Sequence, residues 1–151
     1  MADKFTLGID IGTSGVKASV LDVDNGKVVA HSLKEHPLFH PKPGYAEQEG
    51  DNYWKAVVAA TKDCFNQGSY ADKIAGVSLS GLVGVMLPID KEGKPVRPGM
   101  IWMDSRSEEE CDDIRNSVGE EKINLINGNR LAPWFVEPKA LWMKKHEPHN
   151  F

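Results

Sequence analysis

The sequence is poor in cysteine, since only Cys64 and Cys111 occur among its 151 residues. Two thiols cannot build the disulfide framework of a small secreted domain, so we expect both to be reduced. Long hydrophobic runs are also missing, because no apolar stretch approaches the roughly 20 residues that cross a bilayer. The residues after Met1 lack the basic and then apolar layout of a signal peptide. These absences predict a cytoplasmic protein without a membrane partner.

The chain also lacks a strong excess of charge of one sign. Its formal net charge is −4, with 26% of the residues charged and 40% hydrophobic. This mildly acidic balance offers no basic surface to nucleic acid, and the composition is that of an ordinary globular protein. The length allows one domain with a core of its own, and no more than one.

The most informative stretch is residues 7–22, where two β-branched runs flank a cluster of Gly, Thr and Ser. Glycine permits tight turns and close backbone approach, so this cluster can aim backbone N–H groups at an anion. Asp10 ends the first run, where it could hold a hydrated Mg²⁺, which prefers one or two carboxylates together with phosphate oxygens. The phosphate-binding candidates are Gly12, Thr13, Ser14 and Lys17.

Three kinds of phosphate-binding loop compete for this stretch. A Walker A loop requires G-x-x-x-x-G-K-[ST], and the residues here do not fit it. A Rossmann fingerprint requires G-x-G-x-x-G at the start of a helix. Instead, residues 16–23 alternate apolar and polar side chains, which predicts a strand, and the turn signal Asn25-Gly26 closes it. The anion site is therefore predicted at the tip of a β-hairpin.

Periodicity, turn signals and caps predict the remaining elements. The loop after residue 34 is rich in proline, and its His36 and His40 are expected at the surface rather than on a metal. Trp54 is expected on the buried face of the first helix. The predicted strands are 27–34, 74–81 (buried), 83–89 and 100–102. The predicted helices begin after an Asp51 N-cap, at a capping box Ser105–Glu108, at Glu120 and near Pro138.

A second polar segment, Met103-Asp104-Ser105-Arg106, lies at the entrance of a predicted helix. Asp104 and Arg106 at such a position suit hydrogen bonding to sugar hydroxyls. A helix cap with a surface ion pair explains the same residues equally well.

The motif D-I-G-T-S-G-V-K at residues 10–17 resembles the first phosphate motif of the sugar kinase, Hsp70 and actin superfamily. Four later segments resemble, in order, segments of the FGGY family of carbohydrate kinases. They are Gly44-Tyr-Ala-Glu-Gln48, Ser80–Gly84, Trp102-x-Asp104-x-Arg106 and the stretch from Asn127 to Trp142. The resemblance runs from Gly8 to about Pro148 and is strongest to the xylulose kinases, followed by the gluconate kinases. It implies an α/β, ribonuclease H-like first-lobe fold, whose mixed sheet begins with three antiparallel strands and is flanked by helices.

The resemblance implies transfer of the γ-phosphoryl group of ATP, with Mg²⁺, to a hydroxyl of a small sugar, with D-xylulose expected first and gluconate or another polyol as the alternative. Asp10 would organise the metal, and the four phosphate-binding candidates would meet the phosphates. The residues that would line the sugar site are Ser80, Gly81, Leu82, Val83, Trp102, Asp104 and Arg106. Sugar and ATP are the implied partners, and a homodimer is left open.

Two departures from the family pattern stand out. Xylulose kinases usually carry S-G-Q-M-H-G in the substrate loop, whereas this chain has Ser80-Gly81-Leu82-Val83-Gly84, so the sugar identity is in doubt. Family members are also two-lobed and several times longer. Residues 1–151 are therefore expected to be the N-terminal part of the first lobe, with the second lobe absent and the general base expected beyond Phe151, so that the chain alone would be inactive.

Two other classes of function compete with the kinase fragment. A non-catalytic module could keep the fold to bind a sugar, which the apolar Leu82 and Val83 favour and the intact phosphate motif opposes. An Hsp70-like ATPase would share the phosphate motif, but the segments at residues 45–48 and 102–106 argue against it.

Overall fold

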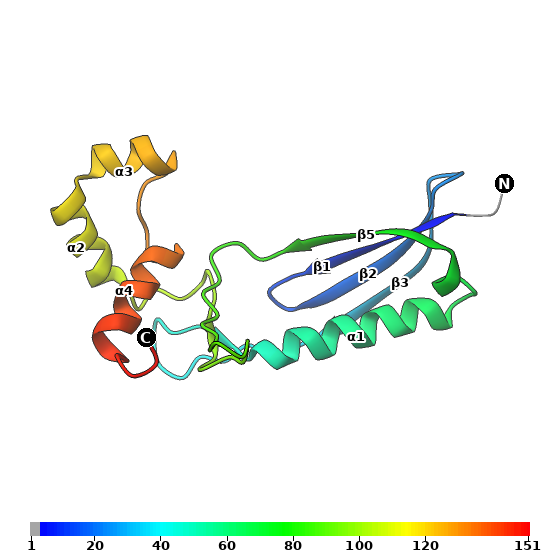
Figure 1. The fold of residues 1–151 in the computed structure, drawn as a ribbon, viewed down its shortest axis with the longest axis horizontal. Helices are drawn as coiled ribbons and strands as arrows, with labels where there is room; N and C mark the ends of the chain where they lie inside the picture. The colour runs from blue at the N-terminus through cyan, green and yellow to red at the C-terminus, as the bar shows by residue number, and fades with distance from the viewer. Residues whose placement is uncertain (1–3) are drawn as a thin grey trace. The chain divides into compact units, whose positions relative to one another are not determined.

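A computed structural model describes residues 4–151, and the chain divides into two compact units (Figure 1). The first comprises the chain up to Pro37 together with Asp51–Leu82, and the second comprises Leu38–Gly50 together with Val83–Phe151. Buried apolar side chains form one cluster in the first unit and two in the second. The expectation of a single core is therefore wrong.

The first unit is built on a four-stranded sheet in the order β3-β2-β1-β5. Its strands are β1 (Phe5–Ile11), β2 (Gly15–Asp22), β3 (Lys27–Glu35) and β5 (Ile74–Gly81). The first three are antiparallel neighbours, and β5 runs parallel to β1. The predicted hairpin and the predicted start with three antiparallel strands are confirmed.

Helix α1 (Gly50–Asn66) lies along one face of this sheet (Figure 1). Alternate strand residues such as Leu7, Ile9 and Val16 are buried in the same cluster as a row of small helix residues. That row is Ala56, Ala60 and Cys64, spaced four apart, which lets the helix approach the sheet closely. Trp54 lies outside the row and is 69% exposed, so its expected burial is wrong. The helix begins one residue before Asp51, which therefore lies in the first turn and is not the N-cap.

Strand β5 forms as predicted, but it is not buried. It is an edge strand of the sheet, and Val77 and Leu79 are 61% and 69% exposed. They pair with the buried Leu7 and Ile9 of β1 and so share their face of the sheet. Its apolar sequence predicts a strand with both faces covered, but the edge position leaves it open, and sequence periodicity carries no information on that position.

The second unit consists mainly of helices and loops. A short antiparallel ladder joins β4 (Glu47–Gln48) to β6 (Gly99–Met100). Three helices follow, α2 (Glu108–Val118), α3 (Glu120–Asn127) and α4 (Val136–His146), and they begin within about three residues of their predicted starts. A short 3₁₀ turn, Ala71–Lys73, belongs to the first unit and precedes β5.

Three local predictions in the second unit are wrong. Residues 83–89 form isolated bridges and no strand, although the turn at Asp90 closes as expected through the bond from Gly93 N to Asp90 O. The strand expected at 100–102 is only the two-residue β6. The capping box fails because α2 begins at Glu108, while Ser105 Oγ donates to Gly44 O instead. Within residues 4–151, no helix is long and apolar enough to cross a membrane.

Candidate functional site

The predicted phosphate-binding residues Gly12, Thr13 and Ser14 lie at the tip of the β1–β2 hairpin, as expected. The amide of Gly12 donates to the carbonyl of Gly15 at 3.0 Å and closes the turn. A Cβ at Gly15 would lie 2.6 Å from the carbonyl oxygen of Lys34, so only glycine lets β3 approach the tip this closely.

His36 supports the hairpin tip from the end of β3. Its ring Nε2 lies 3.1 Å from the carbonyl oxygen of Gly12, and its backbone amide donates to Ser14 O at 3.3 Å. The side chain is 8% exposed and its ring packs edge-on against Tyr53. The expectation of a surface histidine is therefore wrong, because a neighbour 24 residues away in sequence holds the ring. His40, by contrast, is exposed as expected, and its Nδ1 lies 2.8 Å from the carbonyl oxygen of Tyr45.

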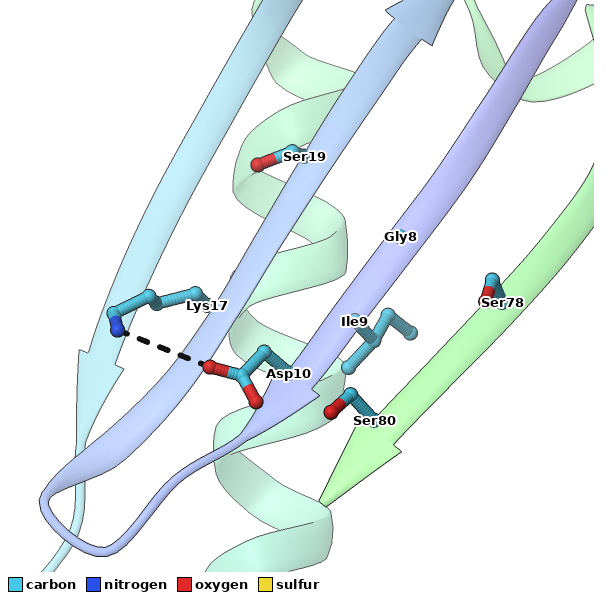
Figure 2. Close-up of a pocket in the computed structure, with 7 residues that line it drawn as sticks. All are labelled: Gly8, Ile9, Asp10, Lys17, Ser19, Ser78 and Ser80. Atoms are coloured by element: carbon cyan, nitrogen blue, oxygen red, sulfur yellow. Dashed lines mark ion pairs between the residues drawn. The ribbon is translucent and has the colours of Figure 1, made fainter.

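The face of the sheet opposite α1 carries an open groove of about 320 Å³ beside the hairpin (Figure 2). Asp10 and Lys17 are partners in the β1–β2 register, and Lys17 Nζ lies 3.8 Å from the Asp10 carboxylate. Both side chains are well exposed, so they are accessible to a ligand. The groove is lined by Gly8, Ile9, Asp10, Lys17, Ser19, Ser78 and Ser80.

This groove brings together residues that the sequence assigned to different roles. Ser80, predicted to contact the sugar, is the partner of Asp10 in the β1–β5 register and lies on the same groove. Ser19 and Ser78 were missed, and the only signal that could have found them is the strand pairing. One carboxylate, one ammonium and three hydroxyls make a donor set that suits a hydrated Mg²⁺ carried by phosphate groups.

Asp10 is the carboxylate of the groove that could bind a metal ion. Within residues 4–151, no group of three or more His, Cys, Asp and Glu side chains could hold a metal ion. A lone exposed carboxylate fits Mg²⁺, because this ion keeps several waters and takes other ligands from substrate phosphates. Asp10 therefore fits a shared Mg²⁺–phosphate site and not a dedicated metal cage.

The predicted sugar-site residues fall into both units. Gly81 pairs with Ile11 at the end of β5, and the amide of Leu82 donates to Ile11 O at 3.1 Å. Val83 belongs to the second unit and is 81% exposed, and Trp102 of the same unit is 48% exposed. Their roles at a sugar remain predictions.

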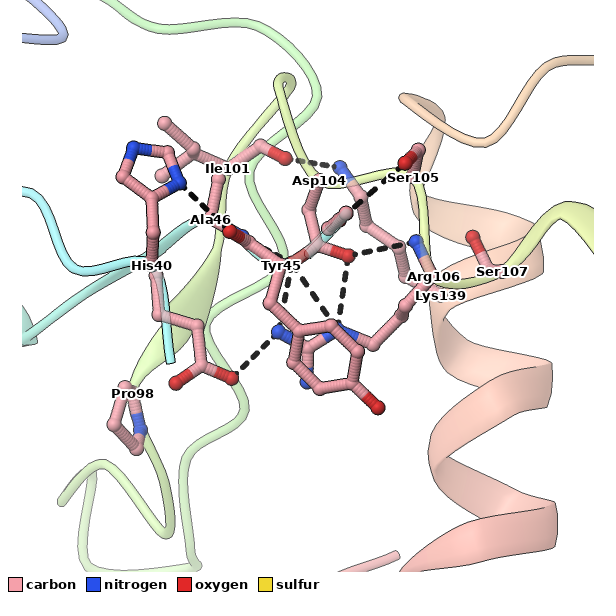
Figure 3. Close-up of polar contacts among 12 residues, drawn as sticks. His40, Tyr45, Ala46, Pro98, Ile101, Asp104, Ser105, Arg106, Ser107 and Lys139 are labelled. Atoms are coloured by element: carbon pink, nitrogen blue, oxygen red, sulfur yellow. Dashed lines mark hydrogen bonds and ion pairs between the residues drawn. The ribbon is translucent and has the colours of Figure 1, made fainter. Parts of the chain in front are cut away.

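Asp104 and Arg106, by contrast, are buried in a network of the second unit (Figure 3). Arg106 Nε donates to Asp104 Oδ1 at 2.9 Å, and Nη2 donates to Oδ2 at 2.7 Å. The same Nη2 bonds Glu47 at 2.6 Å, and Asp104 also accepts from the amide of Ala46 at 2.7 Å. The guanidinium lies 3.6 Å from the centre of the Tyr45 ring. These side chains tie the 45–47 segment to the turn before α2.

Hydrogen bonds and nearby carboxylates favour the charged form of Arg106. Burial pulls the pKa of Arg106 down, but the hydrogen bonds and charges of Asp104 and Glu47 outweigh it, so its pKa lies above the ordinary value. Arg97 adds a second buried guanidinium that pairs with Glu47 and, at 2.8 Å, with Glu147. Buried charges held by this many partners are costly to disturb. The network is therefore a rigid support, and whether Asp104 and Arg106 also meet a sugar stays a prediction.

A further buried charge, Lys139, was missed although it lies in the motif that ends at Trp142. Its side chain is fully buried, and its ammonium donates to the carbonyl oxygens of Gly84, Ile101 and Trp134. Burial lowers the pKa of Lys139 to about 8. The sequence signal that could have found it is a lysine one residue after a proline in the first turn of the helix, followed by the apolar residues 140–143.

The fold defines an α/β protein of the ribonuclease H-like class shared by actin, Hsp70 and sugar kinases. Residues 5–151 match the N-terminal domain of the FGGY family of carbohydrate kinases, and the chain belongs to that family. This confirms the family resemblance and the fold class read from the sequence.

Individual relatives agree with this assignment. A xylulose kinase from Staphylococcus xylosus is 33% identical over 147 residues, which cover 97% of this chain and 30% of the relative. A ligand-bound xylulose kinase from Lactobacillus acidophilus superposes with a TM-score of 0.90 at 26% identity, covering 98% of this chain and 30% of that one. A gluconate kinase from the same organism gives 0.91 at 26% identity, covering 99% and 30%. The chain thus spans about 30% of the length of these relatives.

Proposed function

We propose that this chain is the phosphate-binding and sugar-binding N-terminal part of the first lobe of an ATP-dependent sugar kinase, with D-xylulose as its first substrate. The observation that carries the proposal is the groove beside the β1–β2 hairpin, where Asp10, Lys17 and Ser80 meet at the ends of three neighbouring strands. The family membership and the similarity to xylulose kinases support the same reaction class.

Each groove residue has a distinct role in this proposal. Asp10 would hold a hydrated Mg²⁺ that neutralises charge on the phosphate oxygens. Lys17 and the hairpin hydroxyls of Thr13 and Ser14 would bind and orient the phosphates. Phosphoryl transfer depends mainly on such positioning and charge stabilisation. The residue that accepts the proton of the sugar hydroxyl is expected in the part of the longer relatives that this chain does not span.

The substrate assignment has two alternatives. The first alternative is gluconate or another polyol, because the chain is as similar to a gluconate kinase structure as to a xylulose kinase structure. Arg106 is the basic residue of the predicted sugar segments and could pair with the carboxylate of gluconate. A non-catalytic sugar-binding module of the same fold is favoured by one observation, the apolar and exposed Val83 in a loop that is polar in xylulose kinases.

The proposal is tested by NMR titration of the 151-residue protein with a Mg²⁺-bound, non-hydrolysable ATP analogue, and separately with D-xylulose and gluconate. We expect the nucleotide to move the amide signals of residues 10–17 and 78–80 only when Mg²⁺ is present. We expect the sugar to move those of residues 83–84 and 102. Asp10→Asn should abolish the Mg²⁺-dependent shifts, whereas Asp24→Asn, an exposed carboxylate in the turn between β2 and β3, should leave them intact.

If only gluconate moves the amide signals of residues 83–84 and 102, gluconate replaces D-xylulose as the proposed substrate. Sugar binding without any nucleotide binding would favour the non-catalytic module. No shift at the hairpin with saturating Mg²⁺ and nucleotide would overturn the phosphate assignment.

A further inference from the structure

Lys139 lies in the first turns of α4, and its ammonium group is bonded entirely to backbone carbonyls of its own unit. Nζ donates to Gly84 O at 2.6 Å, to Ile101 O at 2.8 Å and to Trp134 O at 3.0 Å (Figure 3 shows the bond to Ile101). An ammonium has three protons, and these three bonds use all of them. One atom thus ties together three segments that lie 5, 38 and 55 residues from Lys139 in the sequence.

Burying the Lys139 side chain at this position is energetically unfavourable. This side chain has no exposed surface, and burying an ammonium group without a direct carboxylate partner disfavours the charged form. Its position near the N-terminus of α4 is also unfavourable for a cation, because the helix dipole is positive there. An apolar side chain of similar volume would avoid both costs. The charge therefore has a use other than filling the core.

The three bonded carbonyls stand next to exposed residues. Gly84 follows Val83, Ile101 precedes Trp102, and the Trp134 side chain is itself 51% exposed. The spacing between these segments is tight, because a Cβ at Gly84 would lie 2.4 Å from the Trp134 carbonyl oxygen. Gly84 also has φ +72°, which favours glycine. The close backbone contact at Gly84 and the hydrogen bonds of Lys139 together fix the positions of Val83 and Trp102 relative to each other.

We propose that Lys139 is a positioning residue: its ammonium group holds the Gly84, Ile101 and Trp134 segments at one spacing, and thereby sets the geometry with which Val83 and Trp102 meet a sugar. The part that concerns the sugar rests on the proposed function. The set of three hydrogen bonds from Lys139, called the clamp below, does not depend on the proposed function.

The first experiment examines the clamp in the 151-residue protein. Each bonded carbonyl shares a peptide unit with the amide of the next residue, so the reporters are the amide signals of Val85, Trp102 and Phe135. We expect these three signals to titrate together with one midpoint near pH 8, as Lys139 loses its proton next to Asp104 and Arg106. In Lys139→Met the shared titration should vanish and all three signals should start from displaced positions. Lys144→Met, an exposed lysine on the same helix, should behave like wild type.

The second experiment measures D-xylulose affinity through the indole N–H signal of Trp102. We expect Lys139→Met to weaken sugar binding by about tenfold, because Val83 and Trp102 would no longer be held at one spacing to contact the sugar. Lys139→Arg, which keeps the charge and the donors, should restore part of this loss. Nucleotide binding at the hairpin should be unchanged in every variant.

The outcomes separate the clamp from the proposed function. Three amides that do not titrate together in wild type overturn the clamp, as does an unchanged titration in Lys139→Met. Equal sugar affinity in wild type and Lys139→Met, with the amides displaced, overturns the positioning role. Coupled amides with no sugar binding in wild type support the clamp and overturn the proposed function. If Lys139→Met does not fold, the wild-type titration still decides, and Gly84→Ala disturbs the same contact without removing the charge.

Discussion

The guanidinium of Arg106 lies 3.6 Å from the centre of the Tyr45 ring while the same group is bonded to both oxygens of Asp104. The cation is therefore held from its plane by the aromatic face and from its edge by a carboxylate, with 2% of its side chain exposed. The 45–47 segment and the 104–106 turn come from distant parts of the sequence. Arg106 joins them, together with the Asp104 carboxylate that accepts from the amide of Ala46.

Arg106→Ala should lower the free energy of unfolding of the second unit by about 3–5 kcal/mol, because it leaves the buried Asp104 without its countercharge. Arg106→Lys should recover only part of this, since an ammonium cannot make the two parallel bonds. The measurement is a urea titration followed by resolved amide signals of the second unit. Arg130→Ala is the control, because that side chain is 89% exposed. Equal stability of Arg106→Ala and the control would contradict the role assigned to the network.

Cys111 should make the second unit less stable at alkaline pH. Burial raises the pKa of this thiol from 9 to about 11, so between these values the unfolded chain loses the proton first. The folded state then binds more protons, and stability falls as pH rises through this window, by up to about 3 kcal/mol. Cys111→Ala should remove this fall, whereas Ser117→Ala, an exposed position on the same helix, should keep it.

The contribution of the Cys111 thiol to the pH dependence of stability can be separated from the opposing contribution of Lys139. The pKa of Lys139 is lowered from 10.5 to about 8, so the unfolded chain holds that proton longer and stability rises with pH between these values. The contribution of Lys139 is the same in both proteins, so it cancels in the difference between the free energies of unfolding of wild type and Cys111→Ala. If this difference in the free energy of unfolding does not change between pH 9 and 11, the Cys111 thiol has the same pKa in the folded and unfolded states, and the prediction is wrong.

The β5 edge should make the isolated protein self-associate. Its eight residues contain no charge and no proline, and Val77 and Leu79 are exposed, so the usual protections of an edge strand are missing. We expect the sedimentation coefficient to rise with protein concentration, and Val77→Lys to suppress the rise. Leu125→Lys adds the same charge at an exposed apolar site on α3 and should have no such effect. A protein that stays monomeric at all concentrations would refute this prediction.

The 151-residue protein should not turn over Mg²⁺-ATP and D-xylulose by itself. It spans about 30% of the length of its xylulose kinase relatives, and no residue matching the family's general base was identified in the sequence. The check is a steady-state coupled assay repeated after a second purification. Turnover that follows the protein through that step would place the base within these residues.

The sequence by itself determined the elements whose causes are local. β1 to β3 were predicted because alternation and the Asn25-Gly26 turn act within a few residues. α2 to α4 were predicted because apolar periodicity, prolines and glycines also act locally. The family resemblance also followed from short motifs in order, and the whole-chain match confirms it. Asp10 and Lys17 could be placed together because a hairpin turn fixes the pairing of its own strands.

Only the tertiary structure decided the rest. β5 is exposed because the strand order puts it at the edge, and His36 is buried because the hairpin tip folds over it. Ser105 caps no helix because a carbonyl 61 residues earlier competes for its hydroxyl. Lys139 gained two of its three partners, Gly84 and Ile101, from distant segments in the same way. Burial and polar partnership depend on which distant segments meet, and that is set by packing of the whole unit, which no local pattern contains.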